Sequence, residues 1–213
     1  MNEFAPWHNE ALGKKVVEAL KKNGFEAEYC SSAAEAADKV LALIPESASV
    51  GFGGSWTVKA LGIQEKLAGK GNTLLDHGAP GLSNEERQDV RKKQLTCDVF
   101  LSGTNAVTLD GQLVNRDGNG NRVAAMIFGP GKVIVVIGTN KIVKDLDAAE
   151  ERIRMTAAPI NNKRIGLPNP CAQTGLCMDC QTQTRICNVT TIISKRPRST
   201  PFHVFVIGEE LGF

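Results

Sequence analysis

The chain has 213 residues, of which 42% are hydrophobic and 23% are charged, and its formal net charge at pH 7 is +2. This length and apolar content suit one well-packed domain that does not need its six cysteines as disulfide staples. The small net charge argues against a nucleic-acid surface, and no apolar run reaches the roughly 18 residues of a membrane span. The opening MNEFAPWHNE lacks the pattern of a secretory signal, so we expect a cytoplasmic protein with reduced thiols.

Strands and helices are predicted to alternate over the first half of the chain. Short apolar runs predict strands at 25–30, 48–52, 73–75 and 99–102. Helical spacing and cap residues predict helices at 9–23, 32–44, 55–67 and 83–95. Two helix starts, Ser32 to Glu35 and Ser83 to Glu86, have the residues of a capping box. This alternation indicates an α/β layered domain with a largely parallel sheet.

The pattern changes after Gly103, where a hairpin is predicted. Asp110-Gly111 is suited to a type I′ turn between its two strands. The segment from 115 to 122 is predicted to be a polar loop, and 157–170 a Pro- and Asn-rich lead. The remaining predicted elements are strands at 106–109, 112–114, 132–137 and 202–207, and a helix at 145–155. We therefore expect one domain over 1–213, with a cysteine-rich excursion over 168–190 between its last helix and last strand.

Four of the six cysteines lie in one short segment, PCAQTGLCMDCQTQTRICN. A thiolate is a soft ligand, and a Cys-x-x-Cys step lets two sulfurs reach one ion from a tight turn. In a reducing compartment, metal binding is favoured over two disulfides. The spacing matches neither a zinc ribbon nor the ferredoxin run, so an iron–sulfur cluster and structural zinc both remain candidates. The predicted metal ligands are Cys171, Cys177, Cys180 and Cys187. The other two cysteines, Cys30 and Cys97, are expected to pack as small hydrophobes.

A glycine-rich turn is predicted where the strand at 48–52 passes into a helix. Glycines let the backbone approach a ligand, and N–H groups at a helix start favour phosphate or carboxylate. The turn is neither a dinucleotide fingerprint nor a Walker A loop, and a tight turn with a serine cap is the simpler alternative. A second loop follows the strand at 99–102, and the carboxyl ends of strands in open α/β sheets are where ligands bind. The predicted ligand-binding residues are Gly53, Gly54, Ser55, Thr57, Gly103, Thr104 and Asn105.

Three segments, SVGFGGSWTV, LSGTNAVTLDGQLVN and AAMIFGPGKVIVVIGTNKIV, resemble the LUD (lactate utilisation) domain family. The resemblance covers most of 33–158. It implies a Rossmann-like fold of the ribose-5-phosphate isomerase and CoA-transferase type, in which a loop like 53–57 holds a phosphate or part of a thioester. The segments TGLCMDC and RICN are similar to the cysteine tail of a subset of short LUD proteins. Kinship with lactate-operon proteins that carry ferredoxin-like cysteines implies an iron–sulfur cluster, although their closely spaced cluster motifs are not matched here.

Two residues are weak candidates for acid, base or nucleophile. Asp110 sits where some chains of the CoA-transferase type place a nucleophilic Glu, but a carboxylate at an Asp-Gly turn is more typical of turn chemistry. His77, next to Asp76 after a predicted strand, is an acid/base candidate, with a hydrogen-bonded loop histidine as the alternative. In the polar loop, Asn121 and Arg122 are further candidates to face a ligand.

Three functions remain open. The one we favour is a LUD-family component of lactate or related organic-acid oxidation, with an iron–sulfur cluster on the cysteines and redox partner subunits. The second is an isomerase- or transferase-like enzyme, or ligand-binding subunit, for a phosphorylated or CoA-linked metabolite, with a structural zinc. The third is a zinc-stabilised regulatory subunit without catalysis. We expect no nucleic-acid or membrane partner, and a homo-oligomer is compatible with the sequence.

Overall fold

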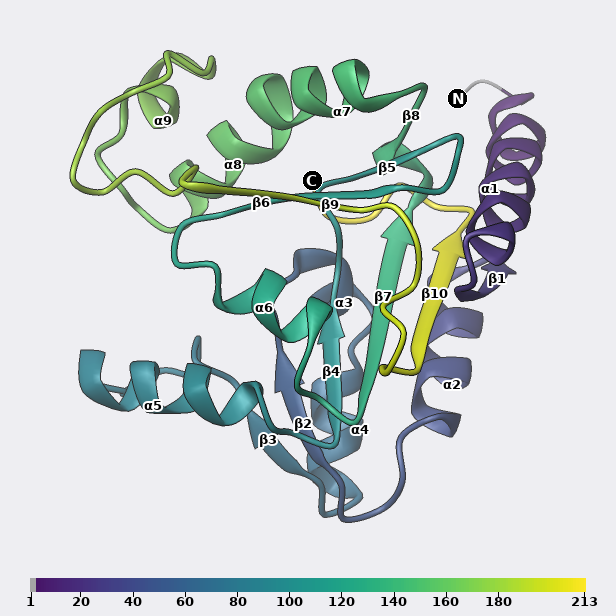
Figure 1. Cartoon of the computed structure of the whole chain (residues 1–213), viewed down its shortest axis with the longest axis horizontal. Helices are drawn as coiled ribbons and strands as arrows, with labels where there is room; N and C mark the ends of the chain where they lie inside the picture. Colours follow the sequence, from purple (N-terminus) through teal and green to yellow (C-terminus); the bar gives the residue numbers. More distant parts are fainter. Residues whose placement is uncertain (1–2) are drawn as a thin grey trace.

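The computed structural model describes residues 3–213, which form two sheets with helices packed around them (Figure 1). All strand pairs of the larger sheet are parallel. Its strands lie in the order β1 (Glu26–Cys30), β10 (Phe202–Ile207), β7 (Lys132–Gly138), β4 (Val99–Ser102), β2 (Ser49–Phe52) and β3 (Thr73–Leu75). The predicted α/β fold with a largely parallel sheet is therefore confirmed.

The smaller sheet is mixed, with its strands in the order β8 (Ile142–Val143), β5 (Ala106–Thr108), β6 (Leu113–Asp117) and β9 (Val189–Ile193). The hairpin strands β5 and β6 pair antiparallel, and β9 adds antiparallel to β6. The strand β8, which follows the core strand β7, pairs parallel with β5. The chain thus returns to this second sheet after the cysteine segment, before the last strand of the large sheet.

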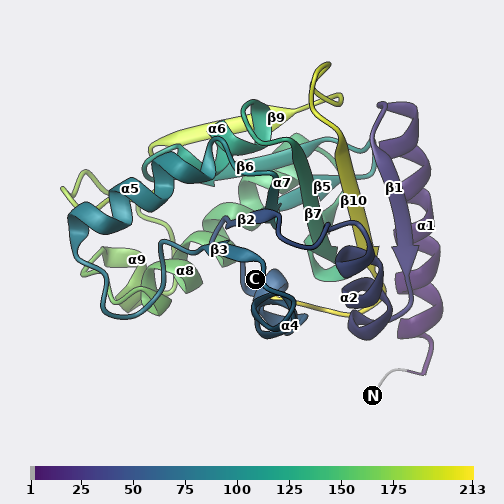
Figure 2. The same cartoon turned by 90° about the horizontal axis from the view of Figure 1, so that it is seen from below.

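Helices cover both faces of the large sheet (Figure 2). One face packs against α2 (Ala33–Ala42), α3 (Trp56–Ala60) and α4 (Ile63–Gly69). The other packs against α1 (Ala5–Lys22), α5 (Asn84–Gln94), α6 (Asn121–Ile127) and the small sheet. The outer face of the small sheet is covered by α7 (Leu146–Arg152), the π-helical turn η2 (Ile153–Ala157) and α8 (Ala158–Arg164). Two short helices complete the set, η1 (Thr139–Lys141) and α9 (Pro170–Thr174).

The core strand β7 shows why the large sheet is buried on both sides. Its side chains alternate between the two faces, so Val133, Val135 and Ile137 pack toward α1 while Ile134 and Val136 pack toward α2–α4. All five are at most 1% exposed. A continuous apolar run is what a parallel strand with helices on both faces requires. Burial of Cys30 and Cys97 in the two cores confirms that both cysteines pack as hydrophobes.

Several local predictions differ from the structure. The helix expected over 55–67 is broken into α3 and α4 at Gly62, which has φ +61°. Glu35 accepts from the Ser31 N–H rather than from Ser32, so the reciprocal capping box is complete only at Ser83. The hairpin turn is not type I′, because that turn needs positive φ at both central residues. Gly111 has φ +77°, but Asp110 is not among the positive-φ residues of the described chain.

Two segments predicted to lack regular structure contain strand and helix. Within 115–122, the first three residues extend β6 and the last two begin α6. Residues 158–164 of the predicted lead form α8, which continues the preceding helix through η2. The cysteine-rich region from 168 to 190 contains the short helix α9 and the start of β9. The turn-rich composition of these segments did not indicate the elements, because each element is short and is stabilised by pairing or packing with parts of the chain distant in sequence or with α8.

A basic pocket at the strand ends

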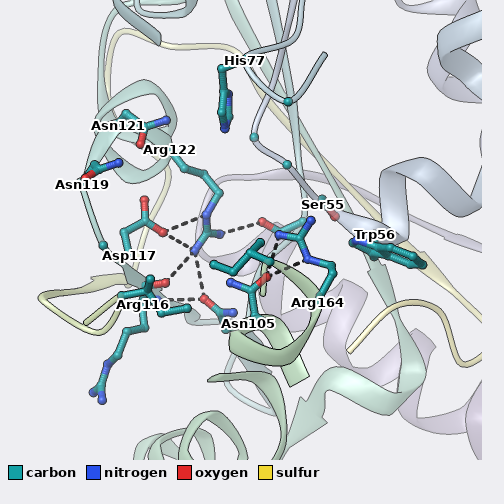
Figure 3. A pocket seen from close by; sticks show the side chains of 18 of the residues that line it. Ser55, Trp56, His77, Asn105, Arg116, Asp117, Asn119, Asn121, Arg122 and Arg164 are labelled. Atoms are coloured by element: carbon teal, nitrogen blue, oxygen red, sulfur yellow. Dashed lines mark hydrogen bonds and ion pairs between the residues drawn. The ribbon is translucent and has the colours of Figure 1, made fainter. Parts of the chain in front are cut away.

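A cavity of about 380 Å³ opens at the carboxyl ends of four parallel strands of the large sheet. The loops that follow β2, β3, β4 and β7 all reach it, as the parallel arrangement requires. Helix α5 and the segment from 116 to 122 close one side, and α8 contributes residues from the small-sheet side. Figure 3 shows side chains that line this space, contributed by different elements, with Arg122 at its centre.

The two glycine loops predicted to line one crevice touch each other here. A Cβ added at Gly103 would lie 2.5 Å from Ser55 Oγ, and one added at Gly53 would lie 2.7 Å from Ser102 Oγ. A Cβ at either position would force the serine hydroxyl to move, because real Cβ atoms do not come so close to another heavy atom. The pocket is lined by Gly53, Gly54, Ser55, Gly103, Thr104 and Asn105. Thr57, the remaining residue predicted to bind a ligand, is fully buried directly behind this wall.

Arg122 is the structural centre of the pocket floor. Its guanidinium donates to Asp117 Oδ1 from Nε at 2.9 Å and to Asn115 Oδ1 from Nη1 at 2.6 Å. It also donates to Asn105 Oδ1 at 2.9 Å. The other oxygen of Asp117 accepts from the Val123 N–H at 3.1 Å, which ties the start of α6 to β6. The Arg122 charge is therefore already neutralised by Asp117, and its donors are occupied by the protein.

The pocket has an excess of positive charge. Asp117 is the single Asp or Glu among the residues lining it, against six basic residues: Arg87, Arg91, Arg116, Arg122, Arg164 and Lys141. The Nε of Arg91 is buried and has no hydrogen-bond partner within residues 3–213. A concave surface lined by one sign of charge concentrates ligands of the opposite sign. The arrangement is suited to an anion.

His77 lies in the pocket, where its ring is held by α5. Gln94 Nε2 is 3.1 Å from His77 Nδ1, and the same amide nitrogen donates to the carbonyls of Phe52 and Leu75. The two hydrogens of this amide are taken by the two carbonyls, so the contact with Nδ1 positions the ring without assigning its proton. Burial lowers the pKa of His77, and the Arg91 charge lowers it further. The neutral form of this pocket-lining imidazole is therefore favoured at pH 7.

Lys141 is a pocket residue that the sequence analysis missed. It is only 3% exposed, and its Nζ donates to Thr57 Oγ1 at 2.7 Å. Burial, with smaller effects from Arg152 and Arg122, lowers the pKa of this lysine to about 7. A usable signal was present in the sequence, because Lys141 follows the core strand β7 in the same way that Thr104 follows β4. Apart from Arg122, the arginines of the pocket carried no such signal, since they come from separate helices and strands.

Asp110 lies away from the pocket, in the turn between β5 and β6. It is exposed, and its carbonyl accepts from Asn23 Nδ2 at 2.7 Å. Of the two acid/base candidates, the structure therefore brings only His77 to the glycine loops. Asn121 and Arg122 both line the pocket as well.

The four predicted metal ligands, Cys171, Cys177, Cys180 and Cys187, line one small cavity. All six cysteines of the chain are free thiols. Burial raises the pKa of Cys171, and the nearby thiols of Cys180 and Cys177 raise it further, which reflects their proximity. Asn169 fixes the segment: its side chain bonds Asn162 and the Thr184 carbonyl, and it accepts from Thr182 and Thr184.

The side chains of the cysteine site are of the type that binds a metal ion or cluster, but they are not placed around a single ion. Within residues 3–213, no three His, Cys, Asp or Glu side chains are placed to hold one metal ion, so the thiols would have to draw together around it. Three arginines, Arg116, Arg154 and Arg185, line the same cavity. Their charges suit the net negative charge that four thiolates leave on zinc or on an iron–sulfur cluster. Donor type and surrounding charge therefore fit such a group.

Strand β6 separates the two sites. Its alternating side chains place Asn115 and Asp117 against Arg122, while the Arg116 side chain extends away from Arg122 (Figure 3). Arg116 pairs with Glu150, and it lines both the basic pocket and the cysteine cavity. Ile186, next to Cys187, also lines both. The two cavities are thus neighbours with a common wall.

The LUD domain family matches residues 13–207, and the chain belongs to this family. A DUF162 family protein from Deinococcus radiodurans has a similar structure, with a TM-score of 0.54 at 16% sequence identity over 93% of this chain and 98% of that chain. No curated protein matches the chain. Within residues 3–213, none of the helices combines the length and apolar character needed to cross a membrane.

Ribose 5-phosphate isomerases match about half of the chain. The enzyme from Plasmodium falciparum gives a TM-score of 0.34 at 17% identity, covering 53% of this chain and 52% of that one. The enzyme from Methanocaldococcus jannaschii gives 0.35 at 16% identity, covering 54% and 55%. Likenesses of this size carry no conclusion about the chain, whereas the Deinococcus radiodurans protein supports the fold.

Proposed function

We propose that this LUD-family protein binds a small anionic metabolite in the basic pocket and serves in the metabolism of organic acids, lactate included. The observation that carries the proposal is the charge of the pocket: Arg87, Arg91 and Arg164 line it without an ion-pair partner among residues 3–213, whereas its one Asp or Glu, Asp117, is already paired with Arg122. The glycine loops leave room for a phosphate or carboxylate group against the backbone. A phosphorylated or CoA-linked acid meets the same requirements and is the alternative ligand class.

Titration calorimetry with lactate, inorganic phosphate, a sugar phosphate and a CoA thioester tests this proposal. Arg164→Ala removes one pocket charge, and we expect it to weaken binding by about tenfold, as loss of one charge-assisted contact does. Lys163→Ala is the matched control, because it removes the neighbouring charge of α8 outside the pocket. Equal affinities in the two variants, or no binding by any member of the panel, would contradict the proposal.

A second proposal concerns the cysteines, and the convergence of four thiols on one cavity supports it. We propose that Cys171, Cys177, Cys180 and Cys187 hold an iron–sulfur cluster, with structural zinc as the alternative. A cluster supplies electron transfer when bound, and its place beside the anion pocket suits oxidation of an organic acid with a redox partner subunit. Zinc supplies a structural clamp and suits an isomerase- or transferase-like enzyme or a binding subunit.

Metal and sulfide analysis of protein purified without oxygen separates these alternatives. Stoichiometric iron and sulfide with a broad absorption band near ~400 nm supports the cluster. A colourless protein that contains one zinc ion per chain supports the structural zinc. Cys180→Ser should lose the metal, whereas Cys97→Ala, which removes a thiol buried in the core, should keep it. Protein that contains neither metal contradicts the second proposal.

A further inference from the structure

Lys141 is buried in the pocket wall with a single hydrogen bond. Its Nζ donates to Thr57 Oγ1 at 2.7 Å, and Thr57 Oγ1 in turn donates to the Leu211 carbonyl at 3.0 Å. Within residues 3–213, Lys141 Nζ has no hydrogen-bond partner other than Thr57. An ammonium group has three donors, so the charged form would leave two of them unmet by the protein. A neutral amine has one N–H donor fewer than an ammonium group, and it carries no charge that needs a counterion.

The charges around Lys141 disfavour its protonated form. Arg152 approaches from α7 and Arg122 from α6, and both lower the pKa of Lys141 in addition to burial. The Arg122 partner, Asp117, is committed to its own ion pair. No carboxylate of the described chain lies within 4.0 Å of Lys141 Nζ, since it forms none of the ion pairs. Across the cavity, Arg87, Arg91 and Arg164 are cationic and His77 is neutral.

We propose that Lys141 is a direct ligand contact that is unprotonated in the free protein and takes up a proton when a phosphate or carboxylate group binds beside it. This inference rests on the proposed anion pocket and adds the residue that couples binding to protonation. The physical reason is that an incoming anion supplies both the counter-charge and the acceptors that Thr57 alone cannot supply. The proton comes from solvent and stays on Nζ while the anion is bound.

Calorimetry in buffers of different ionisation enthalpy counts the protons taken up per anion bound. Sulfate and lactate are the probes, because neither titrates between pH 6 and 9. From a pKa of about 7, we expect uptake of about 0.9 proton per anion at pH 8 and about 0.1 at pH 6. In the wild-type protein, the association constant for either anion should fall about tenfold per pH unit above pH 8.

Three variants assign the proton to its residue. Lys141→Met should abolish the uptake. His77→Gln should retain it, because glutamine does not titrate and the uptake that remains cannot come from position 77. Lys144→Met is the matched control, since this lysine is exposed and lies outside the pocket. Should Lys141→Met fail to fold, the wild-type pH series and His77→Gln still decide the matter.

Binding with no proton uptake at pH 8 would overturn the role of Lys141 and leave the anion pocket intact. Uptake that disappears in His77→Gln would also overturn it. Failure of both probes and of the phosphate and CoA ligands to bind would contradict the proposed function itself. These outcomes are distinct, so the two proposals can fail separately.

Discussion

The basic pocket and the cysteine site are neighbours that are built in different ways. The pocket is formed by the ends of four parallel strands, and its floor is fixed by buried hydrogen bonds of Arg122. The cysteine site is formed by one continuous segment, and its main anchor is the side chain of Asn169. The first site is therefore a product of the whole fold, whereas the second depends on local contacts and on whatever the thiols bind.

The largest expected effect on stability comes from a substitution in the floor of the basic pocket. Arg122→Met would leave the Asp117 carboxylate, with only 8% of its side chain exposed, without its partner. We expect a loss of about 3–5 kcal/mol in the free energy of unfolding, as for a broken buried ion pair. Urea denaturation measures it. Arg154→Met, which removes an exposed arginine next to the cysteines, should change stability by less than about 0.5 kcal/mol, and a similar loss there would remove the contrast.

A smaller and more local effect is expected from Asn169→Leu. Asn169 is 1% exposed and serves both as donor and as acceptor for its neighbours. Its loss should cost about 2–3 kcal/mol, because buried polar groups are left unpaired. Hydrogen exchange should accelerate over residues 168–188 while anion binding in the basic pocket is retained. Gln173→Leu, at an exposed position of α9, is the control. Loss of anion binding in Asn169→Leu would show that the two sites depend on each other.

The contact between the glycine loops can be tested by a pair of substitutions. In Gly103→Ala the new Cβ meets Ser55 Oγ, which must turn away and give up its hydrogen bond to the Val58 N–H. We expect a loss of about 1–2 kcal/mol. Ser55→Ala should then cost less in the Gly103→Ala background than in the wild type. Additive effects of Gly103→Ala and Ser55→Ala would argue against the contact. Gly69→Ala in α4 is the control: its new Cβ has open space around it, and it should stabilise the protein by about 0.5 kcal/mol.

The most gradual effect is a pH dependence that comes from Lys141 in the pocket. The pKa of Lys141 is about 7 in the folded protein and about 10.5 for an ordinary lysine. The unfolded chain therefore holds more protons between these values, so stability rises with pH in this window, by about 1 kcal/mol per pH unit. Denaturation of wild type and Lys141→Met at pH 6 to 9.5 isolates this contribution. Parallel curves for the two proteins would contradict it.

The sequence was informative wherever a short-range pattern determines the structure. The apolar run of β7, the caps at Ser32 and Ser83, and the two glycine loops could all be identified because each depends on adjacent residues. The cations of the pocket could not be assembled in this way, since Arg87, Arg116 and Arg164 meet only after the sheets have formed. The strand β9 was missed because its exposed, threonine-containing sequence is paired at the edge of a sheet that the sequence analysis did not anticipate.

Strand β6 carries a constraint on how the gene for such a chain can vary. Because Asn115 and Asp117 face Arg122 while Arg116 faces the cysteines, inserting or deleting one codon within 113–117 would exchange the two faces. The Asp117 carboxylate would then point toward the thiols, and a guanidinium would point toward Arg122. Within this strand, a change of length by one residue would therefore disrupt both sites at once, whereas a substitution at one position would alter the site that this side chain faces.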